Sequence, residues 1–92
     1  MPSFCLQYDL RINNGNVNGI RRQRVYESID RYLLQRGFQR YQKSCWRREG
    51  VTGFWFHLQT VGLAAHVEGQ FGANAFRSIH YEQRYNFVQV RP

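Results

Sequence analysis

The chain has 92 residues, a length that one hydrophobic core serves, so we expect a single domain over residues 1–92 and exclude a second one. Hydrophobic residues make up 42% and aromatic residues 16%, which excludes a disordered chain, because disordered segments lack this apolar surface. Thirteen basic against six acidic side chains give a net charge of +7, which favours a polyanionic partner, above all a nucleic acid.

The first half of the sequence predicts a strand, a loop and a helix. Apolar residues alternate with polar ones over residues 4–11, the two-residue period of a strand. Six of the seven residues 13–19 are asparagine or glycine, which predicts a long loop. Apolar residues at helical spacing then predict a helix over residues 20–36, and Gly37 follows as its expected stop.

The second half predicts a further helix between strands. Residues 38–47 lack helical periodicity and predict one strand, with a turn at residues 48–50. Residues 51–67 fit both a strand and a helix, and their length favours the helix despite two glycines. A strand over residues 75–82 and a short strand over residues 86–91 complete the chain.

This element order predicts an α+β fold of the ferredoxin-like kind, in which two helices cover one face of a small antiparallel sheet. Fifteen aromatic residues are more than a small domain easily buries alone. The short strand from Phe87 to Val90 would also leave an apolar edge that a partner can pair with. We therefore expect a homodimer.

The location of the protein and the state of its cysteines follow from what the sequence lacks. No apolar run approaches the roughly 20 residues of a membrane helix, and residues 1–4 have no signal-peptide pattern, so we expect a cytoplasmic protein without a membrane partner. Cys5 and Cys45 form no Cys-x-x-Cys pair and fall in apolar-looking strands. Buried free thiols are favoured over a disulfide or a zinc site.

Twelve of the thirteen basic residues are arginines, whose planar guanidinium groups bind phosphate with two hydrogen bonds and stack on bases. The arginines expected to bind RNA lie on or just before the first helix and around the following strand. They are Arg21, Arg22, Arg24, Arg31, Arg40, Arg47 and Arg48. Exposed members of the set Tyr8, Tyr41, Trp46 and Tyr81 are expected to stack on unpaired bases.

Asp9 is the candidate catalytic residue, because it is a carboxylate near the end of the first strand and is followed by Arg11 and the flexible loop. A lone carboxylate also fits a residue that caps its own loop. A divalent cation such as magnesium normally needs two or more carboxylates, which a two-fold axis close to Asp9 would supply from two subunits. Glu27 and Asp30 are one helical turn apart and are expected to pair with arginines rather than a metal ion.

Three histidines offer a second route to catalysis, in which one imidazole takes up a proton from a 2′-hydroxyl group and another protonates the leaving oxygen. His57, His66 and His80 have no spacing that singles one out, and structural roles are favoured for all three. Neither cysteine has a neighbouring histidine, and no glycine-rich phosphate loop is present, so thiol catalysis and nucleotide cofactors lack support.

Three stretches of the sequence resemble the virulence-associated protein D (VapD) family, and also the CRISPR-associated adaptation nucleases of the same fold. The first is the strand Leu6-Gln7-Tyr8-Asp9-Leu10, and the second is the segment 37–46 with its Gln42-Lys43-Ser44 step. The third is the segment 76–87, with an arginine, a Glu-Gln pair and an aromatic end. The resemblance covers most of the chain loosely, through the order of short motifs.

The resemblance implies a ferredoxin-like homodimer with endoribonuclease activity, in which the strand-end aspartate, Asp9 here, is the central catalytic residue. We expect Arg11 to neutralise charge on the phosphate and Ser44 to hold a phosphate oxygen or orient Asp9, although a hydroxyl at a strand end equally fits a bond to its own backbone. VapD relatives act in toxin–antitoxin pairs, which implies an antitoxin partner, and the CRISPR relatives work beside an integrase. The alternative is a basic dimer that binds nucleic acid or protein without cleavage, as an antitoxin or a CRISPR adaptation scaffold.

Overall fold

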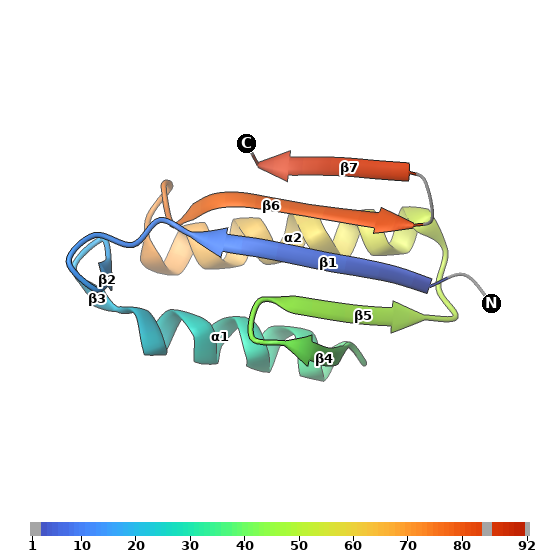
Figure 1. Ribbon diagram of the computed structural model, residues 1–92, viewed down its shortest axis with the longest axis horizontal. Coiled ribbons are helices and arrows are strands. Elements are labelled where there is room, and N and C mark those ends of the chain that lie inside the picture. Colours follow the sequence, from blue (N-terminus) through green and yellow to red (C-terminus); the bar gives the residue numbers. More distant parts are fainter. Residues whose placement is uncertain (1–2, 84–85, 92) are drawn as a thin grey trace.

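The computed structural model describes residues 3–83 and 86–91 of the chain (Figure 1). The elements in these ranges are β1 (Ser3–Leu10), β2 (Asn16–Val17), β3 (Ile20–Arg21), α1 (Arg22–Gln35), β4 (Gln39–Gln42), β5 (Cys45–Glu49), α2 (Gly53–Phe71), β6 (Phe76–Gln83) and β7 (Asn86–Arg91). The expected α+β fold is confirmed, with two helices and a five-stranded antiparallel sheet in the described residues.

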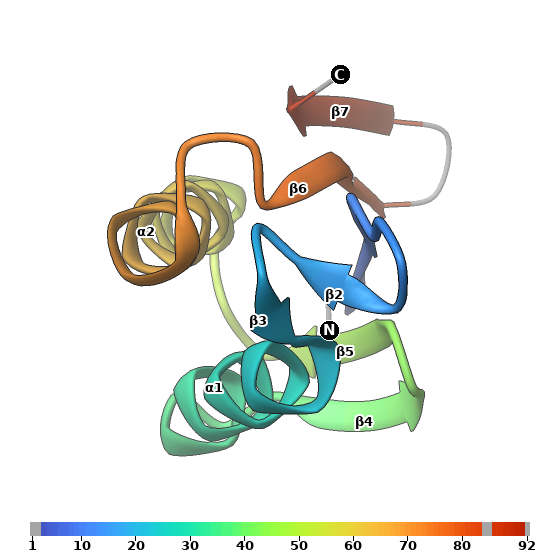
Figure 2. The ribbon, with the colours of Figure 1, turned by 90° about the vertical axis from the view of Figure 1, so that its left-hand side faces the viewer.

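The order of the strands in the sheet is β4-β5-β1-β6-β7, and neighbouring strands run antiparallel. β1 therefore occupies the middle of the sheet. α1 connects β1 to β4, and α2 connects β5 to β6, so that each helix crosses over one strand. Both helices lie on the same side of the sheet (Figure 2), and we call the opposite side the open face.

The two-residue period of β1 separates the core from the open face. Phe4, Leu6, Tyr8 and Leu10 are buried under the helices, as the alternation in the sequence predicts. The residues between them project to the open face. Because β1 pairs with β5 and β6 in fixed register, the same division extends to both neighbouring strands.

The core between sheet and helices is largely aromatic. Phe56 of α2 is fully buried and packs on three rings, with centroid distances of 4.8 Å to Phe4, 5.3 Å to Phe38 and 5.0 Å to Tyr81. α1 contributes Val25, Ile29 and Leu33, which follow the helical spacing of the sequence. Burial of each such side chain contributes about 1.5–3 kcal/mol to the free energy of unfolding.

The loop after β1 is more ordered than the sequence predicts. Asn14-Gly15 and Asn18-Gly19 each have two consecutive positive φ angles, between 51° and 80°, as in type I′ turns. Asparagine and glycine adopt this conformation readily, which explains why the loop contains both pairs. The second turn joins the short strands β2 and β3 into a small hairpin.

The predicted single strand over residues 38–47 is wrong. The segment is a hairpin of β4 and β5 that turns at Lys43-Ser44, and Gln42 pairs with Cys45. The turn contains no glycine, asparagine or proline, so the usual sequence signal for a turn is missing. β5 continues to Glu49, through residues that the sequence assigns to a turn.

The ambiguous segment after this hairpin is a helix, and the helix, α2, extends to Phe71. Thr52 caps its first turn by accepting a hydrogen bond from the backbone N–H of Trp55, at 3.1 Å. Gly62 lies where α1 approaches, since a Cβ atom there would lie 2.6 Å from the Tyr32 hydroxyl oxygen. In the described part of the chain, neither helix is long and apolar enough to cross a membrane.

Candidate functional site on the open face

The open face contains a hollow of about 350 Å³ in the middle of the sheet, which we call the Asp9 hollow. It lies over the last residues of β1, the turn between β4 and β5, and the adjoining part of β6. Its lining residues are Gln7, Tyr8, Asp9, Gln42, Ser44, Cys45, Ser78 and His80. Three segments far apart in the sequence thus place polar side chains around one depression.

Asp9 lies exposed at the edge of this hollow, and a β-bulge directs a cation toward it. Asp9 pairs with Ser78 and Leu10 pairs with Phe76, so Arg77 is the extra residue between them. The Arg77 guanidinium nitrogen lies 3.9 Å from a carboxylate oxygen of Asp9. Arg77 is not among the site residues expected from the sequence, because the sequence contains no signal for the bulge.

Ser44 also lines the hollow, as expected if it assists Asp9. The backbone carbonyl of Ser44 accepts a hydrogen bond from the backbone N–H of Tyr8 at 3.1 Å, which joins the β4–β5 turn to β1. The Tyr8 hydroxyl donates to the carbonyl oxygen of Lys43 at 3.3 Å. These two bonds hold the serine near the end of β1.

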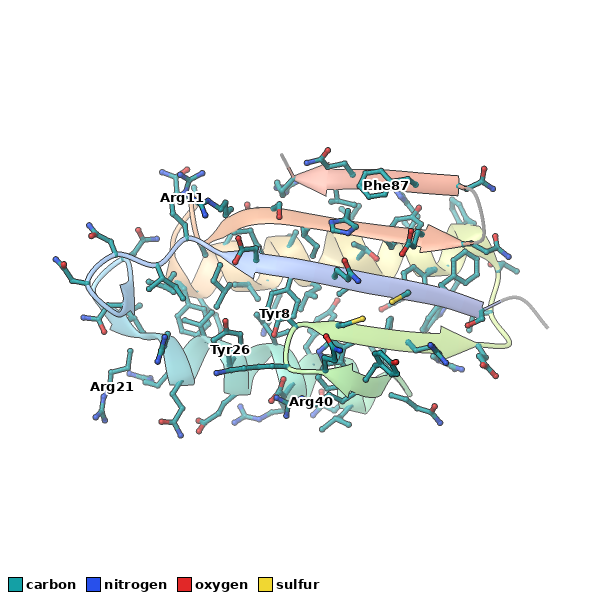
Figure 3. All side chains as sticks on the ribbon, viewed as in Figure 1. Tyr8, Arg11, Arg21, Tyr26, Arg40 and Phe87 are labelled. Atoms are coloured by element: carbon teal, nitrogen blue, oxygen red, sulfur yellow. The ribbon has the colours of Figure 1, made fainter. Side chains whose placement is uncertain are left out.

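Arg11 does not line the Asp9 hollow. Its expected place beside Asp9 requires β1 to continue, but the strand ends at Leu10, after the bulge. The backbone N–H of Arg11 donates to the carbonyl oxygen of Ala75 at 2.8 Å, and Figure 3 shows its side chain at the end of the sheet where β6 begins. Arg77 is the cation next to Asp9 instead.

His80 is the histidine that lines the hollow. It lies opposite Gln7 on β1, diagonal to Asp9, and its Nε2 is 3.0 Å from the side-chain oxygen of Gln7. Because an amide oxygen only accepts, Nε2 carries the proton of this hydrogen bond and Nδ1 is left for another partner. The ring also stacks on Phe87 of β7, with a centroid distance of 4.8 Å.

The other two histidines lie on α2, away from the hollow. His57 makes a 2.8 Å hydrogen bond with the Tyr81 hydroxyl, and the ring of His66 packs on Tyr32 at 5.2 Å. The structure therefore separates three residues that the sequence could not distinguish. Alternation along β6 places His80 on the open face, but only the register with β1 brings it near Asp9.

The two cysteines are free thiols on the open face, and their sulfur atoms lie 3.2 Å apart. Cys45 is buried and lines the hollow, while Cys5 is half-buried beside it. Burial, followed by the hydrogen bond to Cys45, raises the pKa of Cys5 to about 12. Cys5 is therefore protonated at neutral pH, which agrees with a structural role and not with a nucleophile.

The seven arginines expected to bind RNA do not lie on one surface. Arg21, Arg22, Arg24 and Arg31 belong to β3 and α1. Figure 3 shows Arg21 and Arg40 along the lower edge of the molecule, beside α1. Arg40 forms a 3.5 Å ion pair with Asp30. Burial raises the pKa of Asp30, and the charge of Arg40 opposes this shift.

The expected pair Arg47 and Arg48 is divided between the two faces of the sheet, because neighbouring strand residues project to opposite sides. Arg47 lies opposite Cys5 on the open face, with its guanidinium 5.1 Å from the ring centre of Tyr41. Arg48 is half-buried, donates to the carbonyl oxygen of Arg36 at 3.2 Å, and stacks over Trp55. The seven arginines therefore do not form one continuous RNA-binding surface within the subunit.

Of the four aromatic residues expected to stack on bases, Tyr41 alone is exposed. Tyr8, Trp46 and Tyr81 are buried in the core. Phe87, which lies opposite Glu82, is a further exposed ring on the open face and was not expected. Tyr41 and Phe87 stand toward the two outer edges of the sheet, with the Asp9 hollow between their strands.

The residues around Asp9 do not form a metal site within one subunit. In residues 3–83 and 86–91, no group of three or more His, Cys, Asp or Glu side chains could hold a metal ion. Among the described residues, Asp9 is the one carboxylate that lines the hollow, and it forms an ion pair with Arg77. A magnesium ion shared by two copies of Asp9 stays a prediction that depends on the dimer geometry.

The comparisons with known proteins leave this geometry as the main evidence. No family model matches the sequence, and no curated protein and no solved structure is found to match the chain. The resemblance to the VapD family therefore stays a prediction from short motifs.

Proposed function

We propose that this chain is an endoribonuclease that cleaves RNA phosphodiester bonds in the Asp9 hollow. The observation that carries the proposal is the meeting of Asp9, Ser44 and His80 around one depression. A carboxylate, an imidazole and a hydroxyl group are the groups needed to move two protons and to hold a phosphate between them. The sequence motifs also indicate Asp9 and Ser44 as catalytic residues.

The proposed reaction uses the 2′-hydroxyl group of the RNA as the nucleophile. Asp9 accepts the proton of this hydroxyl group while the 2′-oxygen forms a bond to the adjacent phosphorus. Protonated His80 gives its proton to the departing 5′-oxygen as the bond between phosphorus and that oxygen breaks. The products are a 2′,3′-cyclic phosphate and a 5′-hydroxyl group. Ser44 donates a hydrogen bond to a non-bridging phosphate oxygen, and Arg77 stabilises the negative charge that develops there.

RNA binding in this proposal uses the open face rather than α1. Arg47 and Arg77 supply positive charge on the two sides of β1, and Tyr41 and Phe87 supply exposed rings for unpaired bases. The arginines of α1 lie behind the sheet and do not contact the same short segment of RNA. Single-stranded RNA is the favoured substrate, because its bases are free to stack on these rings.

The finer fold belongs to the proposal as well. The order β1-α1-β4-β5-α2-β6 with the sheet order β4-β5-β1-β6 is that of a ferredoxin-like domain, to which β7 adds an edge strand. Together with the sequence motifs, it supports a VapD-like enzyme of toxin–antitoxin type that acts in the cytoplasm as a homodimer beside an antitoxin protein.

The test is cleavage of a fluorescent single-stranded RNA by purified protein, with magnesium and with a chelator. Asp9→Asn keeps the volume and removes the charge, and we expect at least a hundredfold loss of rate, about 2.7 kcal/mol in the barrier, with unchanged melting temperature. His80→Gln is expected to give a comparable loss. A 2′-deoxynucleotide at the cleavage site should abolish cleavage of that bond, because it removes the nucleophile.

Glu82→Gln is the matched control, because Glu82 is also a carboxylate on the open face but does not line the hollow. It should retain the wild-type rate. Full activity in Asp9→Asn, or equal losses in Asp9→Asn and Glu82→Gln, would refute the assignment of catalysis to the hollow.

A second candidate function is RNA binding without cleavage. The guanidinium of Arg47 over the exposed ring of Tyr41 is a ready surface for phosphate and base, and it needs no catalytic group. This function predicts tight, salt-sensitive binding of RNA by a wild-type protein that leaves the RNA intact at every metal concentration. Arg47→Gln would weaken the binding in either case, so cleavage is the measurement that distinguishes the two functions.

A further inference from the structure

The outer side of α2 is unusual for a surface helix. Phe54, Leu58 and Val61 are 75%, 49% and 37% exposed, and Ala65 is exposed as well. We call these four residues the α2 stripe. A helix with apolar residues both toward the core and toward solvent is normally covered on both sides. In Figure 2, α2 lies at the edge of the molecule, and no described element lies beyond it.

The spacing of the α2 stripe is that of a helix-pairing seam. Its residues follow one another at intervals of four, three and four positions, the heptad spacing by which one helix packs against another. The opposite side of α2, with Phe56, Leu63 and Val67, is already buried in the core. The stripe is therefore a second apolar seam, and its occupant should be a helix.

The absence of basic residues from α2 favours a second copy of this basic chain as the occupant. The chain has thirteen lysine and arginine residues, and none of them lies in residues 53–71. Glu68 is the one charged residue of the helix apart from its histidines, and it is paired with Arg91 at 3.0 Å. Two chains of charge +7 repel each other, and α2 adds no cation of its own to this repulsion. Of the guanidinium groups that reach α2, that of Arg91 is neutralised by Glu68, and that of Arg36 binds Gln59.

The sizes of the side chains also match a second copy of the same helix. When two α2 helices pair antiparallel about a two-fold axis, Phe54 lies opposite the partner's Ala65, and Leu58 lies opposite the partner's Val61. Each large side chain then meets a smaller one, an arrangement that fills the space evenly. The contact is isologous, so both subunits use the same residues.

We propose that the α2 stripe is the contact surface for a second copy of this chain, through an antiparallel pair of α2 helices. This inference does not rest on the proposed nuclease function. It leaves both open faces on the outside of the dimer, with a sheet and a helix layer of each subunit between them. Each Asp9 hollow is then complete within one subunit, and the two copies of Asp9 do not share an ion in this assembly.

The first experiment measures mass by light scattering over a range of concentrations. A contact of one helix per subunit is small, so we expect dissociation in the micromolar range and twice the 11.0 kDa chain mass at about 200 μM. Leu58→Glu buries a charge in the contact and should give the single-chain mass at that concentration. Leu34→Glu is the matched control, because Leu34 is a leucine on α1 with 61% exposure, and it should remain dimeric.

The second experiment tests the antiparallel geometry by disulfide trapping in a chain that carries Cys5→Ser and Cys45→Ala. Phe54→Cys mixed with Ala65→Cys should form a mixed disulfide dimer under mild oxidation by oxidised glutathione. Neither variant alone should do so, because each introduced cysteine and its own copy are about 16 Å apart along the helices. A parallel pair would instead crosslink each variant with itself and would overturn the proposed geometry.

Other outcomes overturn the contact as a whole. A wild-type chain that stays at 11.0 kDa at about 200 μM would show that no second copy covers the stripe. A dimer that Leu58→Glu leaves intact would place the contact elsewhere, for instance at the edge strand β7. RNA cleavage measured on the same Leu58→Glu protein is expected to be unchanged, so a failure of the dimer and a failure of the nuclease can be told apart.

Discussion

Replacement of Phe56 by alanine tests whether the aromatic core holds the helical layer on the sheet. Phe56 is fully buried, and three rings lie with their centroids within 5.3 Å of its own. Truncation of a buried phenylalanine costs about 3–5 kcal/mol, and the surrounding aromatic rings place this one toward the upper end. A chain of this length has a total free energy of unfolding of roughly 5–14 kcal/mol, so the loss is a large fraction of it.

The assay is urea unfolding followed by tryptophan fluorescence, together with thermal melting. We expect Phe56→Ala to lower the melting temperature by roughly 15–40 °C. Phe54→Ala is the internal control, since the same substitution two residues earlier removes an exposed ring. At about 1 μM, where the proposed dimer has dissociated, Phe54→Ala should change stability by less than about 0.5 kcal/mol. Similar losses in the two variants would refute the assignment of these residues to opposite sides of α2.

Three further predictions concern local structure and pH. Thr52→Ala removes the cap of α2 and should cost about 1 kcal/mol in urea unfolding, whereas Thr52→Ser should retain most of it. Gly37→Ala should cost at least about 1 kcal/mol, because Gly37 has a φ of 80° and the Arg48 guanidinium lies 3.2 Å from the position of a Cβ atom. Because the pKa of Cys5 is raised to about 12, the folded chain keeps the thiol proton that the unfolded chain loses near pH 8.5. The contribution of the Cys5 thiol to the free energy of unfolding is therefore fully present below about pH 8.5 and falls as the pH rises toward 12. Iodoacetamide at pH 9 should modify Cys5 more slowly in the folded chain than in the chain unfolded by urea. Equal modification rates in the two states would contradict a raised pKa.

The sequence was most informative about features that depend on one helix or one strand alone. The alternation in residues 4–11 identifies the buried side of β1 and leaves Asp9 on the open side, because one strand fixes both. Gly37 ends α1 as expected, since a positive φ at this position depends on the local chain alone. The turn at Lys43-Ser44 was missed because it contains no glycine, asparagine or proline, and a single serine is a weaker turn signal than these residues.

The candidate site was harder to predict from the sequence than the fold, because it depends on pairing between strands that are distant in the sequence. His80 reaches the hollow through the register of β6 with β1, and Arg77 reaches Asp9 through a bulge in that same pairing. Neither the register nor the bulge has a signal in a single sequence. The seven arginines were expected to bind RNA together because they lie on or before one helix and around the strand that follows it, but neighbouring residues of a strand, such as Arg47 and Arg48, project to opposite faces of the sheet.

The central position of β1 has a consequence for how the chain is made. β1 is synthesised first, yet its two partners are β5 and β6, so its second edge stays unpaired until residues 76–82 have left the ribosome. Until then a strand with four large apolar side chains is available to any other unpaired strand, which is the condition under which nascent chains aggregate. Pairing over such long sequence separations is also slow. Efficient production of this protein should therefore depend on protection of β1 during synthesis, and a chain truncated before β6 should not give a soluble fragment.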